Sequence, residues 1–400
     1  MMIRLTHVFA FVVLLTGFAC SAADSVMCGI DVLQQNGFRQ LTGQRIGLIT
    51  NHTGLNRGGV NTVKLLHDAP NVSLTALFSP EHGFEGRLDI SNIDDAADQA
   101  TGLKIFSLYG KTRRPTTTML NNVDTLIFDI QDIGARFYTY VSTMGEAMHA
   151  AAEHGKRFVV LDRPNPINGV DVAGPMLDAG EESFVGFHHL PVRHGMTIGE
   201  LALMIHSELK LDLELEVIRC DGWKRNTLWD ATGLVWVNPS PNMRCLTQAL
   251  LYPGIGLIET TNISVGRGTD TPFEVLGAPW IQPRELAGAL NAHGFPGVAF
   301  VPIRYTPSSS KHANLPCGGI NIVITDREQF RPLLTGFGIS VELQRLYPDD
   351  WKGKDAMRLL GNRRTLDAIL AGQSADKVKQ TATAGLPQFL KRRQTFLLYD

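Results

Sequence analysis

Short apolar runs alternate with amphipathic segments over the first half of the chain. Four of the runs have the length of buried strands and cover residues 45–50, 74–78, 125–130 and 157–162. Segments with helical character lie around them, at 30–38, 62–67 and 144–153. Continuous apolar strands separated by helices predict a mostly parallel sheet covered on both faces, and hence an α/β fold.

The alternation loosens past Asp171, which indicates a second unit. A helix at 197–209 begins with a capping box of Thr197 and Glu200, and a strand follows at 214–219. Residues 238–242 form a proline-locked loop, and further strands are expected near 298–303 and 319–325. Because 400 residues exceed what one core usually holds, we predict two domains, at 24–249 and 250–400.

Residues 1–23 have the pattern of a secretory signal. A basic start precedes a short apolar run and a series of small residues, and the run is too short for an ordinary membrane span. We therefore expect a periplasmic or extracellular protein without an integral membrane span, with a lipid anchor at Cys20 as the minor alternative. The four remaining cysteines could be isolated thiols or form disulfides, and the sequence leaves both open.

The net charge and the absence of several motifs limit the classes of function that the sequence supports. The formal net charge of −2 gives no electrostatic reason to expect a nucleic acid or an anionic membrane surface as partner. The chain has no Walker loop, no G-x-S-x-G elbow, no HExxH and no G-x-G-x-x-G after a strand. We expect no cofactor and no metal. Chemistry that rests on carboxylates, histidine, arginine and tyrosine suits a glycosidase.

Polar side chains follow each of the four strands, where ligands bind in open α/β sheets. Glu81 and His82 come directly after the run at 74–78, beyond Pro80 and among glycines that permit a sharp loop. An acid beside an apolar side chain can serve as a general acid near neutral pH. The structural alternative, a capping glutamate beside a satisfied loop histidine, has about equal weight.

Three more strand ends carry candidate groups, each with a structural alternative. Arg136 could hold a carboxylate, or it could form an internal salt bridge with Asp129 or Asp132. The proline-stiffened loop after 157–162 and the turn around His194 could bind a ligand or only shape the chain. The candidates at these ends and this turn are Asn51, His52, Asp129, Asp132, Arg136, Tyr138, Tyr140, Asp162, Asn165 and His194.

Seven blocks of the sequence resemble the signature blocks of the NamZ-like exo-β-N-acetylmuramidases. They run in order along nearly the whole chain after the signal: ITNHTG at 49–54, SPEHGF at 79–84, FDIQDIGARFYTY at 128–140, LDRPNP at 161–166, RHGM at 193–196, PSPNM at 239–243 and SVGRGT at 264–269. One departure is Arg244-Cys245, where relatives more often carry Pro-Thr.

The resemblance implies a fold and an activity. The fold would be a Rossmann-like domain that carries the site, with a smaller α/β domain closing a cleft over it. The activity would be release of N-acetylmuramic acid from the non-reducing ends of peptidoglycan fragments, so that the partners are peptidoglycan-derived sugars or muropeptides.

The resemblance also implies roles for residues. Glu81 would be the general acid, with Asp129 or Asp132 as the second group. That second group could be a nucleophile, could activate water or could orient the substrate's acetamide. Arg136 or Arg267 could clamp the lactyl carboxylate of the sugar. The other expected site residues are His82, Asn51, His52, Tyr138, Tyr140, Asp162, Asn165, His194, Asn262 and Glu274.

A rival from another class is a non-catalytic periplasmic binding protein for a cell-wall sugar. Such binders are also built from two α/β domains around a cleft, and they use carboxylates too. Release of a monosaccharide from a muramic acid disaccharide would distinguish an enzyme from a binder.

Overall fold

The computed structural model describes residues 26–400. The predicted signal at 1–23 and Cys20 lie outside the described residues. Among the described residues, no helix is both long and apolar enough to cross a membrane. The four cysteines of this part, Cys28, Cys220, Cys245 and Cys317, are free thiols.

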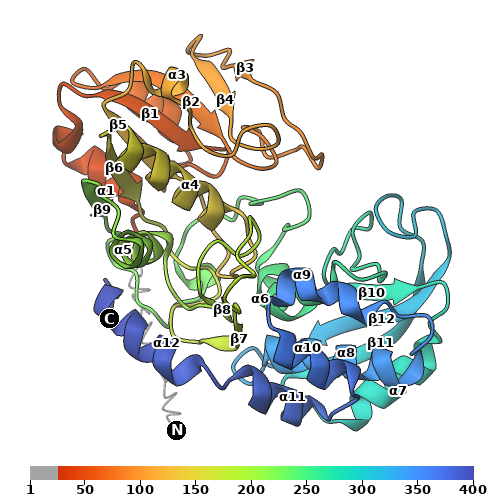
Figure 1. Ribbon diagram of the computed structural model, residues 1–400. Coiled ribbons are helices and arrows are strands. Elements are labelled where there is room, and N and C mark those ends of the chain that lie inside the picture. The colour runs from red at the N-terminus through yellow and green to blue at the C-terminus, as the bar shows by residue number, and fades with distance from the viewer. Residues whose placement is uncertain (1–25) are drawn as a thin grey trace, which may run out of the picture.

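The larger part of the molecule is built on a seven-stranded sheet (Figure 1). Its strand order is β3-β4-β2-β1-β5-β6-β9, and every neighbouring pair is parallel except β3 and β4. The strands are β1 (Arg45–Thr50), β2 (Ser73–Ser79), β3 (Ala96–Ala97), β4 (Lys104–Ser107), β5 (Thr125–Asp129), β6 (Arg157–Leu161) and β9 (Leu215–Ile218). The predicted parallel α/β sheet is confirmed, and β3 and β4 extend it beyond the predicted strands.

Helices cover both faces of this sheet because its central strands are apolar on both sides. Ile127 belongs to a core with α1 and α2, whereas its neighbour Phe128 belongs to a core with α4 and α5. Capping fixes where α5 begins: Thr197 N donates to Oε2 of Glu200 at 3.0 Å, which confirms the predicted capping box. The helices are α1 (Gly29–Gln35), α2 (Thr62–His67), α3 (Thr117–Leu120), α4 (Tyr140–Glu153) and α5 (Ile198–Leu209).

A second, smaller sheet lies in the C-terminal half and is antiparallel, with the order β10-β12-β11. Its strands are β10 (Val275–Ala278), β11 (Val298–Tyr305) and β12 (Cys317–Ile324). The helices of this half are α6 (Leu246–Ile255), α7 (Pro283–Ala292), α8 (Pro332–Leu346), α9 (Met357–Leu360), α10 (Arg363–Leu370) and α11 (Ala375–Ala382). We call residues 246–382 the C-terminal lobe and residues 26–245 the N-terminal lobe.

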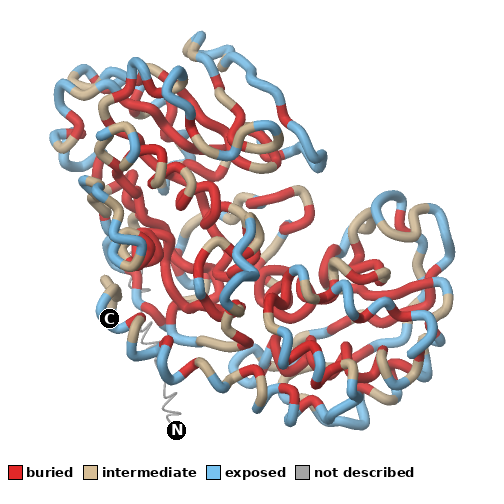
Figure 2. The backbone as a smooth tube through the Cα atoms, in the orientation of Figure 1, coloured by how far each residue is buried: buried red, intermediate tan, exposed pale blue. Residues whose placement is uncertain are grey.

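Short elements connect these parts. A two-stranded antiparallel sheet of β7 (Ala173–Met176) and β8 (Pro191–Arg193) lies between β6 and β9 in the chain. The 3₁₀ turns are η1 (Arg39–Leu41), η2 (Trp229–Ala231), η3 (Gly256–Ile258), η4 (Gly353–Ala356) and η5 (Gln394–Phe396). Figure 2 shows that buried backbone runs through both lobes, and one continuous hydrophobic core contains residues of both.

The end of the chain returns to the N-terminal lobe. Helix α12 (Leu386–Arg393) lies near β7 and α5 in Figure 1, away from the C-terminal sheet. The hydroxyl group of Tyr399 donates a 2.5 Å hydrogen bond to Oδ2 of Asp162, at the end of β6. Leu398 N donates to Oε1 of Glu200 at 2.8 Å. The last 15 residues therefore pack with the first lobe, although they follow the second in sequence.

Candidate active site

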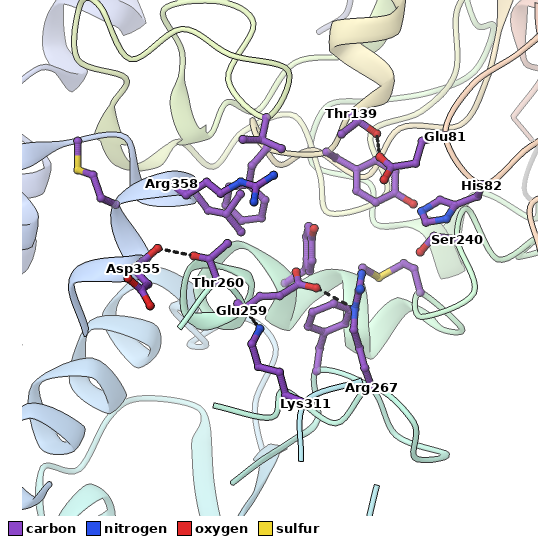
Figure 3. Close-up of a pocket in the computed structure, with 18 of the residues that line it drawn as sticks. Glu81, His82, Thr139, Ser240, Glu259, Thr260, Arg267, Lys311, Asp355 and Arg358 are labelled. Carbon is purple, nitrogen blue, oxygen red and sulfur yellow. Dashed lines mark hydrogen bonds and ion pairs between the residues drawn. The ribbon is translucent and has the colours of Figure 1, made fainter. Parts of the chain in front are cut away.

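A cavity of about 690 Å³ lies between the two lobes (Figure 3). The N-terminal lobe contributes the loop after β2 and the residues before α4, and the C-terminal lobe contributes α6, the segment after η3 and α9. This volume falls within the usual range for small-molecule sites. The ionisable and hydroxyl side chains at its wall include Glu81, His82, Tyr138, Thr139, Tyr252, Glu259, Arg267, Lys311, Lys354 and Arg358.

Glu81 stands at the carboxyl end of β2 and is half-buried in the cavity wall. The loop that presents it turns sharply: His82, Gly83 and Gly86 have φ of 69°, 75° and 64°. Nδ1 of His82 lies 2.7 Å from the carbonyl oxygen of Leu88 and ties the loop to itself. The predicted strand-end loop with an acid at its start is therefore present, and the acid faces the cavity.

Thr139 fixes the carboxylate of Glu81. Its hydroxyl group donates to Oε2 of Glu81 over 2.5 Å. Thr139 is also the N-cap residue of α4, so the carboxylate lies near the positive end of that helix dipole. Figure 3 shows the two side chains side by side at one end of the cavity.

Tyrosine side chains surround this carboxylate and remain protonated. Burial, with a contribution from Glu81, raises the pKa of Tyr109 to about 12. Burial likewise raises the pKa of Tyr138 and of Tyr252 well above the ordinary value. Tyr138 and Tyr252 meet edge to face with ring centroids 6.0 Å apart, and Tyr252 meets Phe273 in the same way at 4.7 Å. Aromatic walls of this kind can pack against a sugar ring.

The C-terminal lobe supplies the opposite wall. Nε of Arg267 lies 2.8 Å from Oε1 of Glu259, and Nη1 of Arg267 lies 3.7 Å from Oδ2 of Asp89. Lys311 donates to the backbone carbonyl oxygen of Glu259. Arg358 projects from α9 toward the cavity, and no ion pair or side-chain hydrogen bond joins it to another described residue.

Four of the residues expected from sequence meet at this cavity: Glu81, His82, Tyr138 and Arg267. The other expected residues do not line it. They lie beneath its walls or elsewhere in the fold, where they contact other protein groups.

Asp129 is a correction to the sequence analysis. It is fully buried, and its two oxygens accept from Nε of Arg163 at 2.6 Å and from Nη2 at 3.0 Å. The hydroxyl group of Thr62 also donates to it. A carboxylate enclosed by an arginine and a threonine cannot reach a substrate, so Asp129 neutralises the charge of Arg163 at the carboxyl end of β5.

Asp132 and His194 form a buried pair away from the cavity wall. Nε2 of His194 lies 3.9 Å from Oδ2 of Asp132, which also accepts from Gly134 N at 2.8 Å. Burial raises the pKa of Asp132 to about 7 and lowers that of His194 to about 3. Both side chains are therefore interior groups, and neither contacts the cavity where the sequence analysis expected catalysis or binding.

Arg136 is the second correction. Its side chain is fully buried, and its guanidinium donates only to backbone carbonyl oxygens. Nη1 donates to Pro175 at 3.0 Å and Leu190 at 2.9 Å, and Nη2 to Leu359 at 2.9 Å and Leu360 at 2.7 Å. Arg136 therefore holds α9 of the C-terminal lobe against the N-terminal lobe, and it does not clamp a substrate.

Three expected residues support the loop at 238–242, whose Ser240 lines the cavity. The hydroxyl group of Tyr140 donates to the carbonyl oxygen of Pro239 at 2.5 Å and accepts from Nδ2 of Asn51 at 3.1 Å. Nε2 of His52 lies 2.6 Å from the carbonyl oxygen of Asn238. These side chains hold the backbone of the loop at 238–242 in place and do not themselves line the cavity.

The remaining expected residues hold local structure. Asp162 accepts from Thr197, Gly199 and Tyr399. Asn165 bonds the backbone of Met196 and Ile167, and Asn262 bonds that of Asp350 and Lys352. Glu274 accepts from Nε2 of Gln248 at 3.0 Å. None of the four lines the cavity, so none is placed to contact a substrate there.

Sequence reasoning missed several cavity residues. Thr139 stands between two tyrosines that were noticed, and its place before a helix is the one signal that could have found it. Those from the C-terminal lobe stand in no recognisable motif: Tyr252, Glu259, Lys311 and Arg358.

The fold and the cavity define a class. A two-lobed α/β protein with an anchored carboxylate and aromatic walls in a cavity between the lobes has the construction of a protein that hydrolyses or binds a sugar. Family models described as the N-terminal and C-terminal parts of exo-β-N-acetylmuramidase NamZ match residues 46–247 and 250–399.

Known proteins are similar over most of the chain. It is 44% identical to the peptidoglycan β-N-acetylmuramidase NamZ of Bacillus subtilis (strain 168) over 378 residues, which are 94% of this chain and 91% of the relative. Two crystal structures of DUF1343 family proteins from Bacteroides fragilis NCTC 9343 have TM-scores of 0.87 and 0.77 at 37% and 32% identity. Each covers 94% of this chain and 99% of its own.

The chain belongs to the NamZ family of exo-β-N-acetylmuramidases. The resemblance seen in the sequence is confirmed, as are the expectations of a glycoside hydrolase and of a Rossmann-like domain with a smaller α/β partner. The rival interpretation as a non-catalytic binding protein is disfavoured by this membership.

Proposed function

We propose that this protein releases N-acetylmuramic acid from the non-reducing ends of peptidoglycan fragments, with Glu81 as general acid. The observation that carries the proposal is the Glu81 carboxyl group, which faces the cavity and is fixed by Thr139. Hydrolysis of a glycosidic bond needs a proton donor for the leaving oxygen. Of the carboxyl groups expected from the sequence to be catalytic, only Glu81 lines the cavity.

Arg358 is our candidate for binding the lactyl carboxylate that distinguishes muramic acid from glucosamine. Its guanidinium has no protein partner among the described residues, whereas Arg267 is already paired with Glu259 and Asp89. A free arginine at a cavity wall suits a carboxylate because the planar guanidinium can donate two parallel hydrogen bonds. Lys354 adds a second positive charge on the same side of the cavity.

We also propose that the protein is exported by the signal at residues 1–23 and acts in the periplasm or outside the cell, with a lipid anchor at Cys20 as the minor alternative. The support is the pattern of a basic start, an apolar run and small residues. The proposed substrate agrees with this location because peptidoglycan lies outside the cytoplasmic membrane.

The test is incubation with a disaccharide that carries N-acetylmuramic acid at its non-reducing end. Release of N-acetylmuramic acid supports the proposal, and an unchanged disaccharide contradicts it. Glu81→Gln should keep the fold and lower turnover at least about a hundredfold, the scale of general-acid contributions. Near-normal turnover of a folded Glu81→Gln variant would remove Glu81 from the role.

A further inference from the structure

Glu259 is a second carboxylate at the cavity, on the lobe opposite Glu81. It follows η3 directly and is tethered by the contacts of Arg267 and Lys311. Its side chain is 15% exposed, and that exposed part faces the cavity. Figure 3 shows Glu81 and Glu259 on different walls, with the cavity between them.

Positive groups contact Glu259 within its buried surroundings. Burial raises the pKa of Glu259, and the positive charges of Arg267 and Lys311 oppose that rise. Oε1 is paired with Arg267 at 2.8 Å, whereas no hydrogen bond from the described residues reaches Oε2. An arginine-paired carboxylate with one open oxygen differs from a closed structural salt bridge, because it can still meet a ligand.

Other carboxylates fit this position less well. Asp129 is enclosed by Arg163 and Thr62, and Asp132 does not line the cavity. Asp355 lines the cavity, but its side chain is exposed and no described residue anchors it. A group that acts on a reacting atom must be held in place, which favours Glu259.

We infer that Glu259 is the second catalytic carboxylate, and that it faces the anomeric carbon of the bound sugar from the side opposite Glu81. This inference rests on the proposed function. In the reaction the bond between the anomeric carbon and the glycosidic oxygen breaks, and Glu81 gives its proton to that oxygen. Water supplies the hydroxyl group that the carbon gains and the proton that restores Glu81. Glu259 opposes the positive charge that develops on the sugar ring.

The experiment compares Glu259→Ala, Glu259→Gln and Glu81→Gln on two substrates: the muramic acid disaccharide and an aryl N-acetylmuraminide with a dinitrophenol leaving group. Both Glu259 variants should lose at least about a hundredfold in kcat/KM on both substrates, since charge development on the ring is common to both. Glu81→Gln should lose far less on the aryl substrate, because dinitrophenol leaves without a proton.

Sodium azide gives a second readout. A small anion that enters the space left in Glu259→Ala should restore turnover and yield a glycosyl azide with inverted configuration at the anomeric carbon, detectable by NMR. A purely structural Glu259 would give no azide product. Absence of that product, or activity of Glu259→Ala within tenfold of the unaltered protein, overturns the inference.

Glu342→Gln is the matched control. Glu342 is also buried in the C-terminal lobe and paired with an arginine, at 2.6 Å from Arg345, but it lies away from the cavity. The Glu342→Gln substitution should lower the melting temperature without lowering kcat/KM. Equal losses in the two glutamate variants would make the Glu259 effect structural and overturn the inference. An unaltered protein that cleaves neither substrate would instead refute the proposed function itself.

Discussion

Thr139 and Glu81 are joined by a 2.5 Å hydrogen bond across the junction between the first turn of α4 and the loop after β2. This bond orients the proposed proton donor without a second charged group. Thr139→Val keeps the shape and removes the donor. A hydrogen bond contributes about 0.5–1.5 kcal/mol, so we expect kcat to fall by up to about tenfold on the disaccharide. Thr139→Ser should retain most of the activity, and unchanged kcat in the valine variant would contradict this role.

Arg358 should make the enzyme prefer sugars with a lactyl group over sugars without one. Arg358→Ala should lower kcat/KM for an aryl N-acetylmuraminide at least about tenfold more than for the matching glucosaminide, because only the first has a carboxylate to lose. Arg284→Ala, an exposed arginine on α7, is the control and should change neither value. Equal losses on both sugars would argue against the assignment.

Replacing Arg136 should damage stability and not specificity. Arg136→Met leaves the carbonyl oxygens of Pro175, Leu190, Leu359 and Leu360 buried without their donor. Each unsatisfied group costs about 1–3 kcal/mol, so the free energy of unfolding should fall by about 3 kcal/mol or more. Chemical denaturation measures this loss. A change of preference between muraminide and glucosaminide, with stability intact, would restore Arg136 as a substrate residue.

Asp132 should make stability depend on pH. Burial raises the pKa of its carboxyl group from 3.8 to about 7, so the folded protein binds the proton more tightly than the unfolded chain does. The resulting stabilisation is complete below pH 4 and is lost as the pH rises to about 7. Relative to Asp132→Asn, the unaltered protein should lose at most about 4 kcal/mol across this window. Denaturation of both proteins at several pH values checks this, and a constant difference would contradict it.

Gly86→Ala should disturb the loop that presents Glu81. A Cβ atom at Gly86 would lie 1.8 Å from Cε1 of His52, and φ there is 64°. We expect a lower melting temperature together with lower kcat. Gly102→Ala is the control: φ is 72°, but a Cβ atom there meets nothing within 4 Å. It should cost only about 1 kcal/mol of backbone strain and leave kcat unchanged. Equal effects of the two changes would show that strain alone is responsible.

The sequence was sufficient to predict the parallel sheet and one wall of the cavity. Apolar runs such as 125–130 can pack only in a doubly covered sheet, and Glu81 follows such a run directly. Polar residues at strand ends, however, do not all face a ligand. Asp129 and Arg163 neutralise each other there, and which polar groups pair inside the protein depends on distances that the sequence does not contain.

The opposite wall could not be predicted for a different reason. Glu259 and Arg358 belong to the C-terminal lobe, and they face Glu81 only because the two lobes pack together. Arg136 contributes to that packing through the backbone of α9, which carries Arg358. Contacts between backbone carbonyl oxygens and a distant arginine leave no trace in local sequence patterns.

The contact between Tyr399 and Asp162 bears on how the protein matures. Asp162 lies directly after β6 in the larger sheet, yet one of its donors, Tyr399, follows it by 237 residues in the chain. The ribosome must therefore synthesise the chain as far as Tyr399, through the whole C-terminal lobe, before that strand end can acquire all its hydrogen bonds. A protease that cleaves before Leu398 would remove a support of the first lobe while leaving every residue of the cavity wall in the chain.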